Sequence, residues 1–170
     1  MCFISIRSQA VLQITFNSNK MHRETSKAAI LQVCIEKQQE LIDHFNERLE
    51  EAKAEVTSHP DSPSQSDEGS NSADDLLHVM VQELAFVNAE MEILKSLDPD
   101  HISKQVERGA VVCTDQRDFF IAVSSEEVDV NGEKVFGMSD KAPLYAKMKG
   151  LKAADTFQFN ETIYKIIDIY

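Results

Sequence analysis

Two long amphipathic helical patterns that flank one polar loop constrain the fold of this chain most strongly. From Glu24 to about Thr57 there is no Gly or Pro, and strong helix formers dominate. A second pattern runs from about Ala73 to Leu97 and ends at Asp98-Pro99, because the residue before a proline is pushed out of the helical region. Two such helices are expected to pack as an antiparallel hairpin with arms of roughly 40–50 Å.

Apolar residues in both segments recur at spacings of three and four, which is the spacing of one helix face. In the second segment they form a heptad seam over more than two repeats. The predicted hairpin core consists of Leu41, Phe45, Leu49, Met80, Leu84, Val87 and Met91. Gln38 takes the one polar position in the first stripe. Homodimerisation through the seam is the lesser alternative.

The connection between the two helices, residues 58–72, is rich in Ser, Pro, Gly and Asn and is predicted to be a loop. Five acidic residues lie in or beside it: Asp61, Asp67, Glu68, Asp74 and Asp75. The net charge of the chain is −12, and residues 1–102 carry 8 Lys/Arg against 18 Asp/Glu. This balance argues against broad binding to free nucleic acid, which relies on Lys and Arg at the phosphates.

After Val106 the pattern changes to short β-strands. Asn131-Gly132, flanked by strand-like segments 128–130 and 134–138, predicts a tight hairpin, since a type I′ turn needs positive φ at both positions. Ser139 or Asp140 is expected to cap a short helix over 143–148, which Gly150 closes. Two further strands are predicted, one around Phe157 and Phe159 and one over 164–169.

These elements predict an α+β fold: an N-terminal antiparallel helical hairpin and a small antiparallel β domain of four or five strands with one short helix. The expected organisation is an extension over 1–21, a hairpin over 22–98 with its acidic tip at about 58–75, a linker over 99–105 and the β domain over 106–170. The alternatives for the first 20 residues are a disordered tail or a short extra strand.

The sequence gives no sign of a disulfide framework, a zinc site, a membrane span or a catalytic motif. Cys2, Cys34 and Cys113 are far apart, so we expect free thiols in a reducing, cytoplasmic compartment, without a disulfide framework or a zinc site. No apolar run approaches the roughly 20 residues that span a bilayer. There is no nucleophile motif and no Gly-rich phosphate loop. An independent enzyme is therefore the least favoured hypothesis.

The C-terminal motifs resemble those of the Gre family of transcript-cleavage factors. The matching segments are Val135-Phe136-Gly137-Met138-Ser139, Ala142-Pro143-Leu144, Gly150-Leu151-Lys152-Ala153-Ala154-Asp155 and the last strand, Tyr164–Ile169. Their order and spacing carry the resemblance, and a helical hairpin before this domain is the Gre order. The resemblance covers about residues 22–170. Ala154 stands where the family usually has Gly.

The resemblance implies that the C-terminal domain is similar in fold to FK506-binding proteins, lacks isomerase activity, and docks at the rim of the secondary channel of bacterial RNA polymerase. The hairpin would enter the channel as a monomer, and acidic residues at its tip would help to hold a second Mg²⁺ in the polymerase active site. The polymerase would then cleave its own backtracked RNA. The free protein would bind no cofactor and no metal stably.

The tip departs from the family pattern, which usually reads Asp-Leu-Ser-Glu-Asn-Ala-Glu-Tyr. Two roles are therefore open for the tip acids Asp67, Glu68, Asp74 and Asp75. They either assist the polymerase metal or keep the loop solvated. In the second case, Asp74 and Asp75 interact favourably with the dipole at the N-terminus of the second helix. The basic residues Lys141, Lys147, Lys149 and Lys152 either dock on an acidic rim of polymerase or form a solvated helix face. Three functions remain open: a cleavage factor, a non-cleaving regulator in the channel, and a coiled-coil adaptor unrelated to polymerase.

Overall fold

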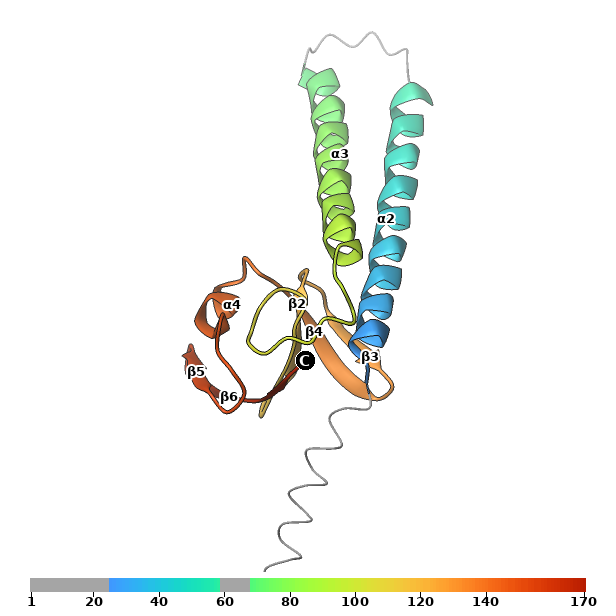
Figure 1. Ribbon diagram of the computed structural model, residues 1–170. Helices are drawn as coiled ribbons and strands as arrows, with labels where there is room; N and C mark the ends of the chain where they lie inside the picture. The colour runs from blue at the N-terminus through green and yellow to red at the C-terminus, as the bar shows by residue number, and fades with distance from the viewer. Residues whose placement is uncertain (1–24, 59–67) are drawn as a thin grey trace, which may run out of the picture. The chain divides into compact units, whose positions relative to one another are not determined.

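The computed structural model describes residues 25–58 and 68–170, and it has a helical hairpin followed by a β-rich unit, which confirms the α+β class (Figure 1). Residue contacts divide the chain into two compact units. One, Gln32–Leu97, contains most of the hairpin, and the other combines residues 25–31 with residues 98–170. The expected N-terminal extension lies outside the described residues.

The hairpin consists of α2, Lys27–Ser58, and α3, Glu68–Lys95. α2 begins where the sequence favours a cap, because the Ser26 hydroxyl accepts a 3.1 Å hydrogen bond from the Ala29 amide. α3 starts at Glu68, so the prediction of a loop was wrong for residues 68–72. Poor helix formers such as Gly69 are tolerated there because an acidic residue at a helix start is favoured by the dipole, and terminal positions lack most intrahelical bonds.

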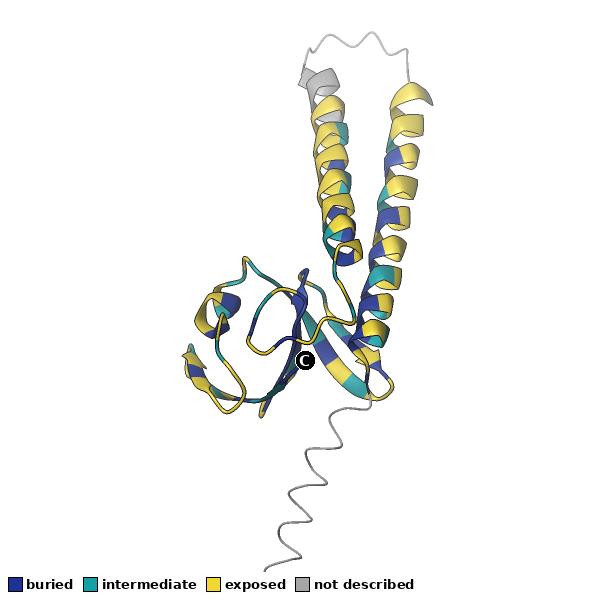
Figure 2. Cartoon of the chain, viewed as in Figure 1, coloured by how far each residue is buried: buried dark blue, intermediate teal, exposed yellow. Residues whose placement is uncertain are grey.

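Apolar side chains between the two helices form the hairpin core. Its centre is a cluster of Ile42, Val87 and Met91, against which Ile35, Phe45 and Leu84 pack. Leu49 and Met80 are also buried, and Figure 2 shows buried residues recurring along both helices. The prediction that Leu41 belongs to the core was wrong, since it is 39% exposed and Ile42 is 7% exposed. Both residues fit helical spacing from Gln38, and packing selects the step of four.

The β unit contains one six-stranded sheet in the order β3-β4-β2-β1-β6-β5. The strands are β1 Val111–Thr114, β2 Asp118–Ala122, β3 Glu127–Val130, β4 Glu133–Ser139, β5 Thr156–Phe159 and β6 Thr162–Ile169. The sheet therefore has more strands than the four or five expected. All paired neighbours are antiparallel except β2 and β4, which run parallel. In the sequence β3 comes between these two strands, and it runs opposite to both.

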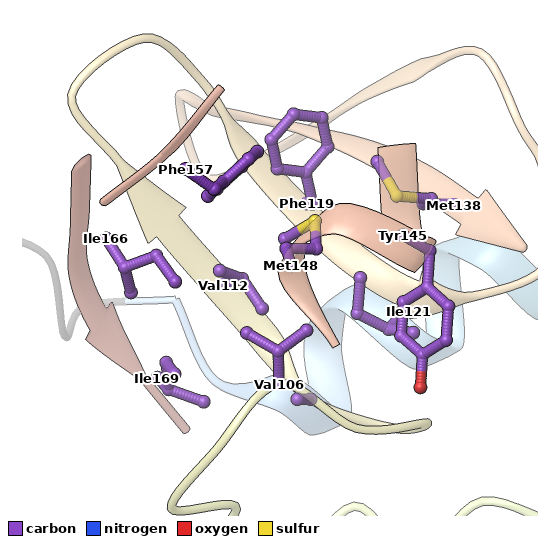
Figure 3. Close-up of a cluster of buried hydrophobic side chains, with 11 residues drawn as sticks. Val106, Val112, Phe119, Ile121, Met138, Tyr145, Met148, Phe157, Ile166 and Ile169 are labelled. Atoms are coloured by element: carbon purple, nitrogen blue, oxygen red, sulfur yellow. The ribbon is translucent and has the colours of Figure 1, made fainter. Parts of the chain in front are cut away.

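One face of the sheet carries the larger core of this unit, which includes the short helix α4, Pro143–Met148. Figure 3 shows Tyr145 and Met148 of α4 among side chains of the sheet such as Phe119 and Val112. On the paired strands β5 and β6, the rings of Phe157 and Tyr164 stack with centroids 5.0 Å apart. The buried side chains of Tyr145 and Met148 fix α4 on the sheet.

The opposite face of the sheet is also buried, through Val111, Phe120, Val128 and Val135. Thr25, just before α2, donates a 3.2 Å hydrogen bond from its hydroxyl to the Val130 carbonyl. The hydroxyl of Tyr170, the last residue, donates to the Thr25 carbonyl at 3.1 Å. Thr25 is thus built into the β unit.

The predicted turn between β3 and β4 is confirmed, with φ of 56° at Asn131 and 85° at Gly132. The expected cap of α4 was wrong: Ala142 holds the cap position without a side-chain bond, and Pro143 begins the helix. Ser139 serves the turn before it, because its hydroxyl accepts a hydrogen bond from the Lys141 amide at 3.2 Å. None of the described helices is long and apolar enough to cross a membrane.

Candidate functional site

The acidic residues predicted for the hairpin tip are only partly brought together. Asp74 and Asp75 are both exposed and lie within α3. Consecutive helical residues point about 100° apart, so these two carboxylates do not form a ready pair of metal ligands. Glu68 is the first residue of α3, its side chain is not described, and Asp67 lies outside the described residues. Within residues 25–58 and 68–170 there is no cluster of three or more His, Cys, Asp or Glu side chains suited to a metal.

The basic residues predicted for docking lie on α4 and on the turn before it and the loop after it. The turn between β4 and α4 is tied to the segment before β1 by Arg108, whose guanidinium pairs with the Asp140 carboxylate through Nη2 and donates from Nε at 3.1 Å. This pair uses Asp140, the acidic residue next to Lys141 in the sequence. The start of α4 is therefore fixed, and its one flanking carboxylate is already neutralised.

The four lysines on α4 and on the segments that flank it lie at the surface, while one side of α4 is buried. Tyr145 and Met148 are buried in the core below the helix, and burial raises the pKa of the Tyr145 hydroxyl. Lys141, Lys147, Lys149 and Lys152 are all exposed. No carboxylate in the described part of the chain forms an ion pair with any of the four ammonium groups. These four exposed lysines, on α4 and on the segments that flank it, are hereafter called the α4 patch.

The loop after α4 is held by backbone hydrogen bonds to the segment before β1. The Gly150 amide donates to the Val106 carbonyl, and the Val106 amide donates to the Leu151 carbonyl, each at 2.8 Å. The Lys152 amide donates to the Asp155 carboxylate at 2.7 Å. Gly150 and Ala154 have φ of 77° and 76°, so this loop requires left-handed backbone at both positions. The loop thereby fixes the end of the α4 patch.

The sequence pattern did not reveal a buried lysine at the start of α2. Lys27 is 6% exposed, and its ammonium donates a 2.5 Å hydrogen bond to the His101 carbonyl. Burial lowers the pKa of Lys27, while the charges of Asp98 and Glu107 oppose that shift. His101 and Glu107 lie 3.2 Å apart through Nε2 and Oε1, and this contact lowers the pKa of Glu107. Lys27 therefore holds the 98–107 segment within the β unit.

The two described thiols are buried and poorly suited to nucleophilic chemistry. Burial raises the pKa of Cys34 to about 11. Burial and neighbouring carboxylates raise the pKa of Cys113 further in the same direction. A thiol reacts as its thiolate, which neither residue forms readily near neutral pH. The described surface thus offers charged contact regions, and neither of these thiols is an active nucleophile.

Comparison with known proteins gives no family assignment. No protein-family model matches the sequence, and no curated protein matches it. Among solved structures, the transcription factor Gfh1 is similar with a TM-score of 0.33 and 16% identity, over 80% of this chain and 92% of that one. The GreA factor homolog 1 (Gfh1) of Thermus thermophilus has a TM-score of 0.30 and 16% identity, over 80% and 94%. Gfh1 of Thermus aquaticus has a TM-score of 0.30 and 18% identity, over 79% and 92%.

Proposed function

We propose that this protein is an accessory factor of RNA polymerase that inserts its helical hairpin into the secondary channel and docks through its β unit. The order of the C-terminal motifs supports this proposal, because it resembles the Gre order along most of the chain. The hairpin itself supplies the physical basis. Its helices contain 32 and 28 residues, which at 1.5 Å per residue gives arms of roughly 40–50 Å.

The observation that carries the docking half of the proposal is the exposed α4 patch. Its four lysines lie within 12 residues of sequence, in a chain whose net charge is −12. Complementary charge mainly steers association and selects the partner. A local basic surface on an acidic protein fits an acidic rim at the entrance of the channel.

Of the two modes of action, occupation of the channel without metal delivery is favoured by the geometry of α3. A carboxylate pair that is to help hold Mg²⁺ must converge on one point. Asp74 and Asp75 are adjacent on a helix and diverge. Stimulated cleavage of backtracked RNA, assisted by Asp67 or Glu68 and by Mg²⁺ shared with the polymerase, is the second candidate, supported by the number of acids at the tip.

A transcript-cleavage assay on a stalled, backtracked elongation complex separates these functions. The protein is added with Mg²⁺, and the length of the RNA is followed with time. Faster shortening, lost when Asp67, Glu68, Asp74 and Asp75 are replaced by Asn or Gln, would establish the cleavage mode. Binding without shortening, together with inhibition of a true Gre factor, is the expected result.

Binding to core polymerase must be measured in the same experiment, by co-sedimentation at low salt. The four tip substitutions should leave this binding intact. Failure of the unmodified protein to bind core polymerase would exclude both modes and leave the adaptor hypothesis.

A further inference from the structure

α3 carries an exposed apolar stripe that the hairpin core does not use. Leu76, Val79 and Phe86 are 57%, 48% and 61% exposed. They are separated by three and seven residues, so they lie along one side of the helix. Ile93, seven residues further on, is half-buried and continues the row. Exposed apolar residues that line up in this way mark an interaction surface more often than scattered single residues do.

Polar residues elsewhere on the hairpin show what a solvated helix surface looks like in this chain. Gln32 bonds Glu36, Gln39 bonds Asp43, and Lys53 bonds Glu50, each pair at 2.8 or 2.9 Å along α2. These pairs link side chains three or four residues apart, as expected of a surface that faces water. Leu76, Val79 and Phe86 cannot form such pairs, because their side chains are apolar.

The charges beside the stripe identify the chemistry of its partner. Asp75 is adjacent to Leu76, and Glu83 lies between Val79 and Phe86 in the same row; both are exposed. Lys95, its last residue, is the only Lys or Arg of α3. A second copy of the same stripe would bring carboxylates against carboxylates. A partner helix with its own apolar row and flanking Lys or Arg would match both features.

We propose that the stripe formed by Leu76, Val79 and Phe86, with Asp75 and Glu83 beside it, binds a basic amphipathic helix of a partner protein. This surface shares Asp75 with the tip acids and lies on a different element from the α4 patch. This binding goes beyond the proposed function, because it does not require that the partner protein is RNA polymerase. The aromatic side chain of Phe86 is the anchor, because large apolar side chains contribute most to small interfaces.

The test uses the full chain and a fluorescent synthetic peptide of leucine and lysine, with leucines at heptad spacing to form a basic amphipathic helix. Fluorescence anisotropy measures its binding to the protein. Val79→Gln and Val81→Gln provide a matched pair, because both valines are 48% exposed on α3 and Val81 points away from the stripe. Phe86→Gln tests the anchor. A peptide with glutamate in place of every lysine tests the role of charge.

The proposal predicts that Val79→Gln and Phe86→Gln each weaken binding of the basic peptide by about tenfold, while Val81→Gln leaves it within about twofold. The glutamate peptide should not bind. Absence of binding by the basic peptide would overturn the proposal, as would equal losses with Val79→Gln and Val81→Gln. Self-association in sedimentation that disappears with Phe86→Gln would assign the stripe to a second copy instead. Circular dichroism confirms that each variant keeps its helices.

Discussion

Gln38 Nε2 donates a 2.8 Å hydrogen bond to the carbonyl oxygen of Val87, so one buried polar contact ties α2 to α3. Gln38 is 6% exposed and also approaches a carboxylate oxygen of Glu90 at 3.4 Å. A single polar residue in an apolar seam selects one register, because a shifted register would leave its amide without a partner. This contact places Ile42, one turn later on α2, within the core with Val87.

We predict that Gln38→Ala lowers the free energy of unfolding by about 1–3 kcal/mol, through loss of the hydrogen bonds and formation of a cavity. Gln38→Leu should stay within about 1.5 kcal/mol of the natural protein, because it keeps the volume and the Val87 carbonyl retains its bond within α3. Urea unfolding followed by circular dichroism measures both. An unchanged midpoint for Gln38→Ala would show that the contact does not stabilise the hairpin.

Ala154 has φ of 76°, a left-handed conformation that costs a residue with a Cβ roughly 1–2 kcal/mol. Ala154→Gly should therefore raise the free energy of unfolding by up to about 1 kcal/mol, after the entropy that glycine adds to the unfolded chain. Thermal unfolding measures the change. Ala146→Gly is the matched control: the same substitution inside α4 should destabilise by about 1 kcal/mol. A change in the free energy of unfolding in the same direction for both variants would contradict this account.

Gly137 on β4 is required by the close approach of the segment that follows β2. A Cβ at this position would meet the Ser125 hydroxyl and would lie 2.7 Å from the Val123 carbonyl oxygen. We expect Gly137→Ala to destabilise by about 1–3 kcal/mol, as overpacking does. Ser125→Gly added to it should recover only part of this loss, because the contact with backbone remains. Full recovery in urea unfolding would show that the hydroxyl alone sets the requirement.

The buried Cys34 thiol makes stability depend on pH in alkaline solution. Its pKa is about 11 in the folded chain against an ordinary value of 9.0, so the folded state retains a proton that the unfolded state loses. The contribution of Cys34 is complete below pH 9 and is lost as pH rises from about 9 to 11.

Cys34→Ala should be less stable than the natural protein at pH 8, because it leaves a cavity. The difference between the two proteins should narrow by up to about 2–3 kcal/mol as pH approaches 11. Urea unfolding at a series of pH values measures this difference, and comparing the two proteins removes the parallel effects of Cys113 and Tyr170. A difference that stays constant with pH would refute the assignment to Cys34.

The α4 patch gives a prediction about binding. Replacing Lys147 and Lys149 by Gln should weaken association with core RNA polymerase by about tenfold at low salt, with a smaller effect at high salt, because screening already weakens the contact. Lys104→Gln with Lys165→Gln is the control, since both lysines are exposed and lie outside the patch. Equal weakening by the two pairs would indicate that only the total charge matters.

Local chemistry in the sequence was sufficient to predict most of the elements. The helical hairpin, the Asn131-Gly132 turn and the helix over 143–148 follow from spacing, from positive φ and from a proline at a helix start. The start of α3 was missed because a segment rich in Ser, Gly and Asn indicates a loop, whereas the first turn of a helix tolerates these residues. The tip acids and the α4 lysines were found as residue types, and the structure adds that each of these lysines is exposed.

Other features were decided only by the tertiary structure. Leu41 and Ile42 are equally apolar and equally compatible with helical spacing, and packing against Val87 and Met91 determines which one is buried. Lys27 is buried because a carbonyl distant in sequence, that of His101, lies within reach of its ammonium. The sequence determines which residues can form a helix, a turn or an apolar face, since those preferences act over a few residues. Burial is decided by contacts between distant segments, which no local pattern contains.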